Sequence, residues 1–176
     1  MCLLIVKPKG VPMPDICTLY QAYLCNPDGS GFASTHDYYK TLDFQKFYER
    51  LSLVDDSEAC IIHFRFATHG SVCKSNCHPF KHKDVYFAHN GILGIKPIKD
   101  KTDSETAFIK RFVPIIDNYG FHSPELTKAV NRIIGYSKFA FLRDTEVLTF
   151  GQFHEIEGCL YSNLRSFGTQ VLKGVI

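Results

Sequence analysis

The chain has 176 residues, enough to bury one sizeable core and too few for two domains of ordinary size, so we expect a single domain over residues 1–176. Its 45% apolar and 22% charged residues argue against disorder, and its net charge of +2 comes without the basic cluster that gathers nucleic acid. No apolar run approaches the roughly 20 residues that cross a bilayer, and the apolar start is too short for a secretory signal, so we expect a cytoplasmic protein without membrane partners.

The first third of the chain predicts short buried strands that alternate with amphipathic helices. The run CLLIV at residues 2–6 is short, continuously apolar and followed by turn residues, as in a strand covered on both faces. A helix over 16–24 should bury one apolar stripe, made of Ile16, Leu19, Tyr20, Tyr23 and Leu24, before a turn at 26–29. A strand over about 31–35, a helix over 44–51 and a strand over 59–66 should follow.

The rest of the chain predicts more helices and hairpins. A strand is expected over 85–88, and Thr102 with Glu105 forms a capping box that should start a helix at about Asp103. Ser123-Pro124-Glu125 should start another helix, which Gly135 ends. Residues 138–142 and 147–150 predict an antiparallel pair, and two more short strands should finish the chain. Strands that cluster in hairpins, with helices in separate groups, favour an α+β layered fold over alternating βαβ units.

The seven cysteines show no repeated spacing of a disulfide framework, and their number is odd. We expect most of them to be buried thiols and at least one to be chemically active.

Histidines and cysteines are concentrated between Cys60 and Gly91, which hold five of the eight histidines. One interpretation is a set of satisfied or exposed histidines. A second is a zinc site built from Cys73, Cys77 and the histidines beside them, but structural zinc sites use two well-separated ligand pairs and no second pair is evident. We therefore expect no metal.

A third interpretation comes from the order of the motifs. HFRFATHG at 63–70, NCHPF at 76–80, AHNG at 88–91 and TDSE at 102–105 follow a cysteine at position 2 and an NPDGSG loop at 26–31. Each piece alone is weak, but the ordered series over residues 1–110 resembles the signature of the class II glutamine amidotransferases, which are N-terminal-nucleophile hydrolases. The resemblance implies a four-layer αββα sandwich of two mainly antiparallel sheets, and an amide hydrolase that needs no cofactor.

The resemblance makes Cys2 the nucleophile once Met1 is removed, and elementary chemistry explains the arrangement. A cysteine thiol with a pKa of about 8.5 is a few per cent thiolate at neutral pH and needs a base. An α-amino group with a pKa of about 7.7–8.0 is such a base, and it belongs to the nucleophile itself when cysteine is residue one. Cysteine is small enough for methionine removal, so we expect a mature chain that begins at Cys2.

The other site residues implied by the resemblance have ordinary alternatives. Asn90 and Gly91 would bind the oxyanion, although Asn-Gly also ends strands in turns. Arg65 would bind the carboxylate of glutamine, yet it could point to water between two phenylalanines. Asp103 would bind the amine, yet it could only support a helix start. Thr68 and His69 match residues that line the same pocket and are expected to position the substrate.

Leu3 and Leu4 follow the nucleophile where family members that make amino sugars or nucleotide precursors usually have glycine, so the chain resembles a divergent, stand-alone branch. Three hypotheses remain open: a free-standing amidohydrolase acting on glutamine or a glutamine-like amide, a glutaminase subunit that hands ammonia to a separate synthetase, and a non-catalytic binding module on the same scaffold.

Overall fold

The computed structural model describes residues 2–67 and 70–167, which form two antiparallel sheets. The six-stranded sheet has the order β3-β2-β4-β1-β10-β9. Its strands are β1 (Leu3–Lys7), β2 (Ser30–Ser34), β3 (Tyr38–Thr41), β4 (Cys60–Phe64), β9 (His154–Ile156) and β10 (Cys159–Tyr161). The four-stranded sheet has the order β5-β6-β7-β8 and consists of β5 (Phe80–His82), β6 (Val85–Asn90), β7 (Lys138–Arg143) and β8 (Glu146–Phe150).

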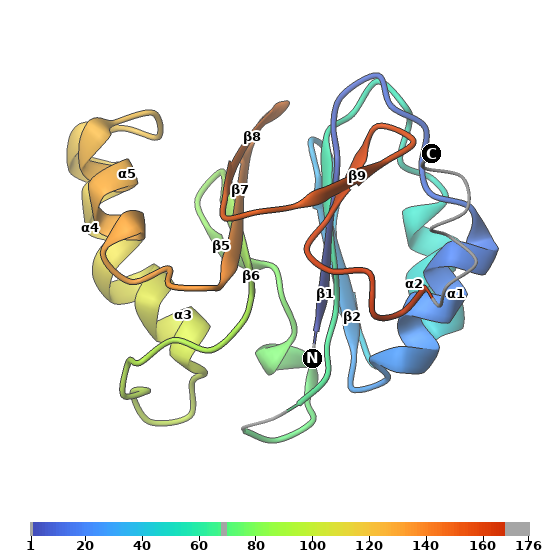
Figure 1. Ribbon diagram of the computed structural model, residues 1–176, viewed down its shortest axis with the longest axis horizontal. Helices are drawn as coiled ribbons and strands as arrows, with labels where there is room; N and C mark the ends of the chain where they lie inside the picture. Colours follow the sequence, from blue (N-terminus) through green and yellow to red (C-terminus); the bar gives the residue numbers. More distant parts are fainter. Residues whose placement is uncertain (1, 68–69, 168–176) are drawn as a thin grey trace.

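Helices cover the outer face of each sheet (Figure 1). On the six-stranded sheet lie α1 (Ile16–Cys25) and α2 (Phe44–Leu51). On the four-stranded sheet lie α3 (Asp103–Ala107), the π-helical turn η2 (Phe108–Phe112), α4 (Val113–Tyr119) and α5 (Pro124–Asn131). A short 3-10 turn, η1 (Lys74–Asn76), lies in the connection before β5. The four layers are therefore helix, sheet, sheet, helix, which confirms the predicted αββα sandwich.

Three apolar cores separate these layers, and β1 contributes to two of them. Leu3 and Ile5 pack in the core under α1 and α2, whereas Leu4 and Val6 pack between the sheets. Because successive side chains of a strand point to opposite faces, a strand buried on both sides is mostly apolar along its whole length, which explains the run at the start of the chain. The core between the sheets contains Ala33, Ala59, Ala88 and Ala140, whose small side chains let the sheets approach.

Local signals in the sequence account for most of the helix starts. The Thr102 hydroxyl accepts a hydrogen bond from the Glu105 N–H, and the Ser123 hydroxyl caps α5 by accepting from the Leu126 N–H. Asp15 caps α1 and Asp43 caps α2 in the same way. Each cap satisfies one of the backbone N–H groups that a helix start leaves without an intrahelical partner.

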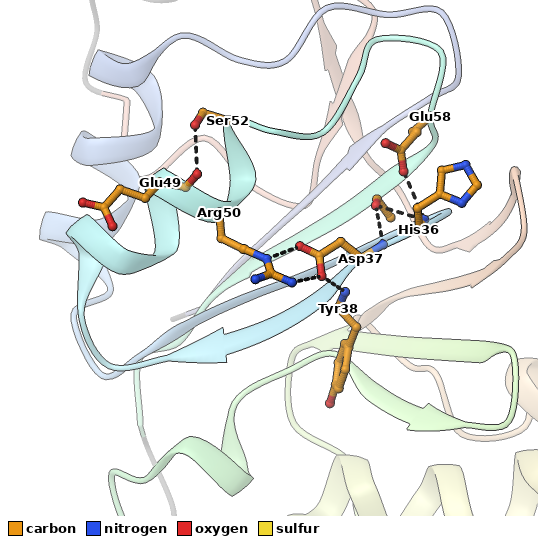
Figure 2. A network of polar contacts seen from close by, with 8 residues as sticks. His36, Asp37, Tyr38, Glu49, Arg50, Ser52 and Glu58 are labelled. Atoms are coloured by element: carbon orange, nitrogen blue, oxygen red, sulfur yellow. Dashed lines mark hydrogen bonds and ion pairs between the residues drawn. The ribbon is translucent and has the colours of Figure 1, made fainter.

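The turn between β2 and β3 is tied to α2 by an ion pair, as Figure 2 shows. The Arg50 guanidinium donates two hydrogen bonds to the Asp37 carboxylate, at 2.7 and 3.0 Å. The same turn is closed by the buried Ser34 hydroxyl, which accepts from the N–H groups of His36 and Asp37. The arrangement stabilises the outer edge of the six-stranded sheet.

Two expectations about side-chain burial were wrong, the first of them only in part. Ile16, Tyr20 and Leu24 of the predicted stripe are exposed on α1, whereas Leu19 of that stripe is buried as expected, together with Ala22. Only three of the seven cysteines are buried, namely Cys60, Cys77 and Cys159, while Cys17 and Cys25 lie on the exposed side of α1. All seven thiols are free within the described part of the chain. No helix among the described residues is long and apolar enough to cross a membrane.

Candidate active site

A cavity of about 290 Å³ opens beside the start of β1. Four of the residues singled out from the sequence line it: Cys2, Arg65, Gly91 and Asp103. They come from the start of β1, the end of β4, the end of β6 and the start of α3. The remaining wall is contributed mainly by the segment between β6 and α3, with Ile92, Leu93, Ile95, Pro97, Lys101, Thr102 and Ser104, and by Phe66, Ala67, Gly70, Asn76, His78 and His89.

Cys2 is half-buried, and its sulfur is held against the chain that leaves β4. The Phe66 N–H donates to Cys2 Sγ at 3.3 Å, and the Phe66 carbonyl oxygen lies 3.5 Å from the same sulfur. Burial raises the pKa of the Cys2 thiol above its usual value, although the Phe66 hydrogen bond and the charge of Arg65 oppose this effect. The thiol is therefore neutral at neutral pH and needs a base before it can attack.

Arg65 points into the protein and not to water, since its exposed fraction is 4% whereas that of Phe66 is 43%. Its Nη1 donates to the Ser71 carbonyl oxygen at 3.0 Å. The backbone N–H of Arg65 donates to the Gly29 carbonyl oxygen at 2.7 Å. Asp28, in the loop after α1, accepts a hydrogen bond from the Ala67 N–H at 2.7 Å. The NPDG segment thus fixes the backbone that carries Arg65 along the cavity wall.

Asn90 and Gly91 lie where β6 ends. Gly91 lines the cavity, and Asn90 is buried directly beside it. The Asn90 Nδ2 donates to Ser162 Oγ at 2.7 Å, and the buried Asn90 Oδ1 has no hydrogen-bond partner. Ser162 Oγ also accepts from the Leu4 N–H at 2.9 Å, so a single hydroxyl joins Asn90 to the strand that carries Cys2.

Asp103 does support a helix start, and it also faces the cavity. One of its oxygens accepts from the Ser104 N–H at 2.8 Å, and the other accepts from the Leu93 N–H at 2.9 Å. The second bond holds the segment after Gly91 against the first turn of α3. A carboxylate has about four lone-pair sites, so these bonds leave it able to accept from an ammonium group.

Three histidines form a buried histidine cluster behind the cavity: His63, His78 and His89. The ring centroids of His63 and His78 are 4.3 Å apart, and His63 Nε2 lies 3.1 Å from the His89 carbonyl oxygen. Burial lowers the pKa of His63 to about 3 and that of His89 to about 4, and it lowers the pKa of His78 well below the usual value. The cluster is neutral near pH 7, and groups with such low pKa values are poor proton acceptors at that pH.

Thr68 and His69 lie outside the described residues. Within the described ranges, no group of three or more histidine, cysteine, aspartate or glutamate side chains is placed to hold a metal ion. Asp28 and Ser104 lie within the NPDGSG and TDSE motifs but were given no role of their own, and Ser162 lies outside every motif. Ser104 donates to or accepts from His89 Nδ1 at 2.7 Å. Serine and aspartate are common in turns and caps, so residue type alone did not distinguish them.

Comparison with known proteins agrees with this architecture. An allosteric regulatory enzyme of purine biosynthesis has the same fold, with a TM-score of 0.60 and 15% identity, over 98% of this chain and 43% of that protein. This likeness supports the four-layer αββα arrangement described above. The sequence profile of the class II glutamine amidotransferases matches residues 51–139, about half of the chain, and the chain belongs to this family.

A probable glutamine amidotransferase of Saccharomyces cerevisiae, DUG3, is 33% identical over 106 residues. The match covers 46% of this chain and 29% of the yeast protein. The chain therefore spans less than half the length of both relatives.

Proposed function

We propose that this protein hydrolyses the side-chain amide of glutamine, or of a closely related compound, with Cys2 as the nucleophile after removal of Met1. The observation that carries the proposal is that Cys2, Arg65, Gly91 and Asp103 line one cavity. A sulfur nucleophile, a backbone N–H at a glycine, a cation and an anion are the groups needed to attack an amide and to hold a zwitterion.

The reaction begins with the free α-amino group of Cys2, which takes the thiol proton. A base is needed because burial raises the pKa of the thiol, and the α-amino group is favoured because the nearby histidines have pKa values too low to accept a proton readily at pH 7. The sulfur attacks the carboxamide carbon to form an S–C bond, and the electron pair of the C=O π bond moves onto oxygen. The C–N bond then breaks, ammonia leaves with the transferred proton, and water cleaves the thioester to give glutamate and the free thiol.

The oxyanion formed in both steps would be bound by the Gly91 N–H and the Asn90 side-chain amide. Each such donor contributes roughly 3–4 kcal/mol to transition-state binding. Neither group carries a proton that it could lose at working pH. Arg65 would pair with the α-carboxylate and Asp103 with the α-amino group, as charge-assisted hydrogen bonds in a partly buried site. Thr68 and His69 are proposed to position the substrate.

Intact mass and covalent labelling test the proposal. Purified protein should lack the mass of Met1 and gain one adduct from a glutamine-like diazo ketone, and Cys2→Ala should abolish the adduct. A protein that keeps Met1, or that labels elsewhere, contradicts the mechanism. A binding module would keep its function in Cys2→Ala.

Arg65 tests whether the natural amide carries an α-carboxylate. Arg65→Ala should raise KM for free glutamine more than it lowers kcat, while Arg143→Ala, which removes an exposed ion pair with Asp84, should change neither. An unchanged KM in Arg65→Ala would mean that the substrate lacks that carboxylate.

A separate synthetase that receives the ammonia remains part of the proposal. Its addition should stimulate glutamine hydrolysis and trap the ammonia in product. A free-standing amidohydrolase would release all of the ammonia to solution at an unchanged rate.

A further inference from the structure

The hydrogen bonds around Ser162 involve both the nucleophile strand and the residue proposed to bind the oxyanion. Ser162 follows β10 and has an exposed fraction of 1%. Its Oγ lies 2.9 Å from the Leu4 nitrogen and 2.7 Å from Asn90 Nδ2, and its own N–H donates to the Leu4 carbonyl oxygen. Next to it, the Asn163 side chain donates to the Cys2 carbonyl oxygen at 2.9 Å.

The hydrogen bonds around Ser162 would also allow a second orientation of the Asn90 amide. In the structure both neighbours of Ser162 Oγ donate to it, while Asn90 Oδ1 is buried without a partner. A half-turn of the amide exchanges Oδ1 and Nδ2. The Ser162 hydroxyl can then donate to Oδ1 while it still accepts from the Leu4 N–H, because a hydroxyl has one proton and two lone pairs.

The two orientations suit two states of the site. In the structure the buried Oδ1 lacks a donor, and without substrate an amide NH2 in its place would lack an acceptor, which costs about 1–3 kcal/mol. An oxyanion bound at that position would supply a strong acceptor and make the exchanged orientation favourable. A hydroxyl serves both states because it can accept from Nδ2 in one and donate to Oδ1 in the other.

We propose that Ser162 is a positioning residue that holds the Asn90 amide in both orientations and directs Nδ2 to the oxyanion during catalysis. This inference rests on the proposed function. It adds to the site a residue from the end of the described chain, distant in sequence from every motif of the first 110 residues.

The test is a double-mutant cycle in the full protein with Met1 removed, with glutamine as substrate. Ser162→Ala should lower kcat about 10- to 100-fold and change KM less than about threefold, whereas Asn90→Ala should lower kcat about 100- to 1,000-fold. Because Ser162 acts through Asn90, adding Ser162→Ala to Asn90→Ala should lower kcat no further, within about threefold. Ser162→Thr keeps the hydroxyl, so a folded Ser162→Thr variant should retain most of the wild-type kcat. If this variant does not fold, the double-mutant cycle of Ser162→Ala and Asn90→Ala is the deciding measurement.

The control is Ser34→Ala, which removes another buried hydroxyl that accepts two hydrogen bonds, here from the backbone N–H groups of His36 and Asp37, and that lies outside the cavity lining. It should keep kcat within about twofold even where its thermal stability falls as much as that of Ser162→Ala. An unchanged kcat in Ser162→Ala would overturn this inference but not the proposed function. The same holds if Ser162→Ala lowers kcat by an equal factor in the wild-type and Asn90→Ala backgrounds. A wild-type protein that releases no ammonia from glutamine would overturn the proposed function, and this inference with it.

Discussion

Gly91 is a residue at which the structure predicts a large cost for a single methyl group. A Cβ there would lie 2.2 Å from Ser137 Oγ and 2.7 Å from Ser137 Cβ, and the backbone φ is +145°. Overpacking a tight site costs about 1–3 kcal/mol, and a non-glycine residue in such a backbone conformation costs about 1–3 kcal/mol more. Gly91→Ala should therefore lower the free energy of unfolding by roughly 2–6 kcal/mol.

Thermal and urea unfolding measure this effect. At about 2–4 °C per kcal/mol for a chain of this size, the melting temperature should fall by roughly 5–20 °C. Gly94→Ala is the matched control, because a Cβ at Gly94 meets nothing within 4 Å and should change stability by less than about 0.5 kcal/mol. Adding Ser137→Gly to Gly91→Ala should recover the steric part of the loss, seen as a coupling energy of about 1–3 kcal/mol. Equal stabilities of Gly91→Ala and Gly94→Ala would refute the reasoning.

Three further predictions follow from the charges and thiols. The histidines of the buried cluster have folded-state pKa values below the usual 6.5, so their contribution to stability is complete above pH 6.5 and is lost as the pH falls toward 4. The urea midpoint of unfolding should therefore drop between pH 7 and pH 5. A midpoint that stays constant over this range contradicts the prediction. Lys7 is buried, and its Nζ donates to the carbonyl oxygens of Asp56 and Glu58. Lys7→Met should therefore lower the free energy of unfolding in urea by about 2–4 kcal/mol. Lys9 is exposed, so the control Lys9→Met should change this free energy by close to zero. Hydrogen bonds from two serine hydroxyls lower the pKa of Cys73 to about 7, whereas burial raises the pKa of Cys77. Iodoacetamide at pH 7 should therefore alkylate Cys73 well before Cys77, as measured by peptide mass spectrometry. The reverse order of alkylation would be inconsistent with these contacts.

The sequence predicted the elements whose signals are local. The apolar run of β1, the capping residues Thr102 and Ser123, and the β7–β8 hairpin all depend on neighbours within a few positions. The short strands β3 and β5 were not predicted, because strands of three or four residues offer too few positions for a periodic pattern.

The buried face of α1 was predicted only in part, since Leu19 is buried but Ile16, Tyr20 and Leu24 are exposed. Large apolar residues on α1 occupy two adjacent faces, and spacing alone does not choose between them. The sheet selects Leu19 and Ala22, since the small alanine side chain lets the helix approach closely. Tyr20 is left exposed, where its ring stacks on Tyr23 and packs at a tilt against Phe44. Tertiary contact thus decides a choice that periodicity leaves open.

The candidate site follows from strand register more than from any single motif. Leu3 lies opposite Phe64 in the β1–β4 pair, which brings Cys2 beside the residues that follow β4. Ile5 lies opposite Tyr161 in the β1–β10 pair, which brings Ser162 to the level of Leu4. Because side chains alternate along a strand, a slip of one residue in β4 would turn Arg65 away from the cavity and Phe64 into it. The motifs around Arg65 and Asn90 were readable because their residue types are chemically unusual in that order. Ser162 was not, because its role depends on a pairing between strands 158 positions apart.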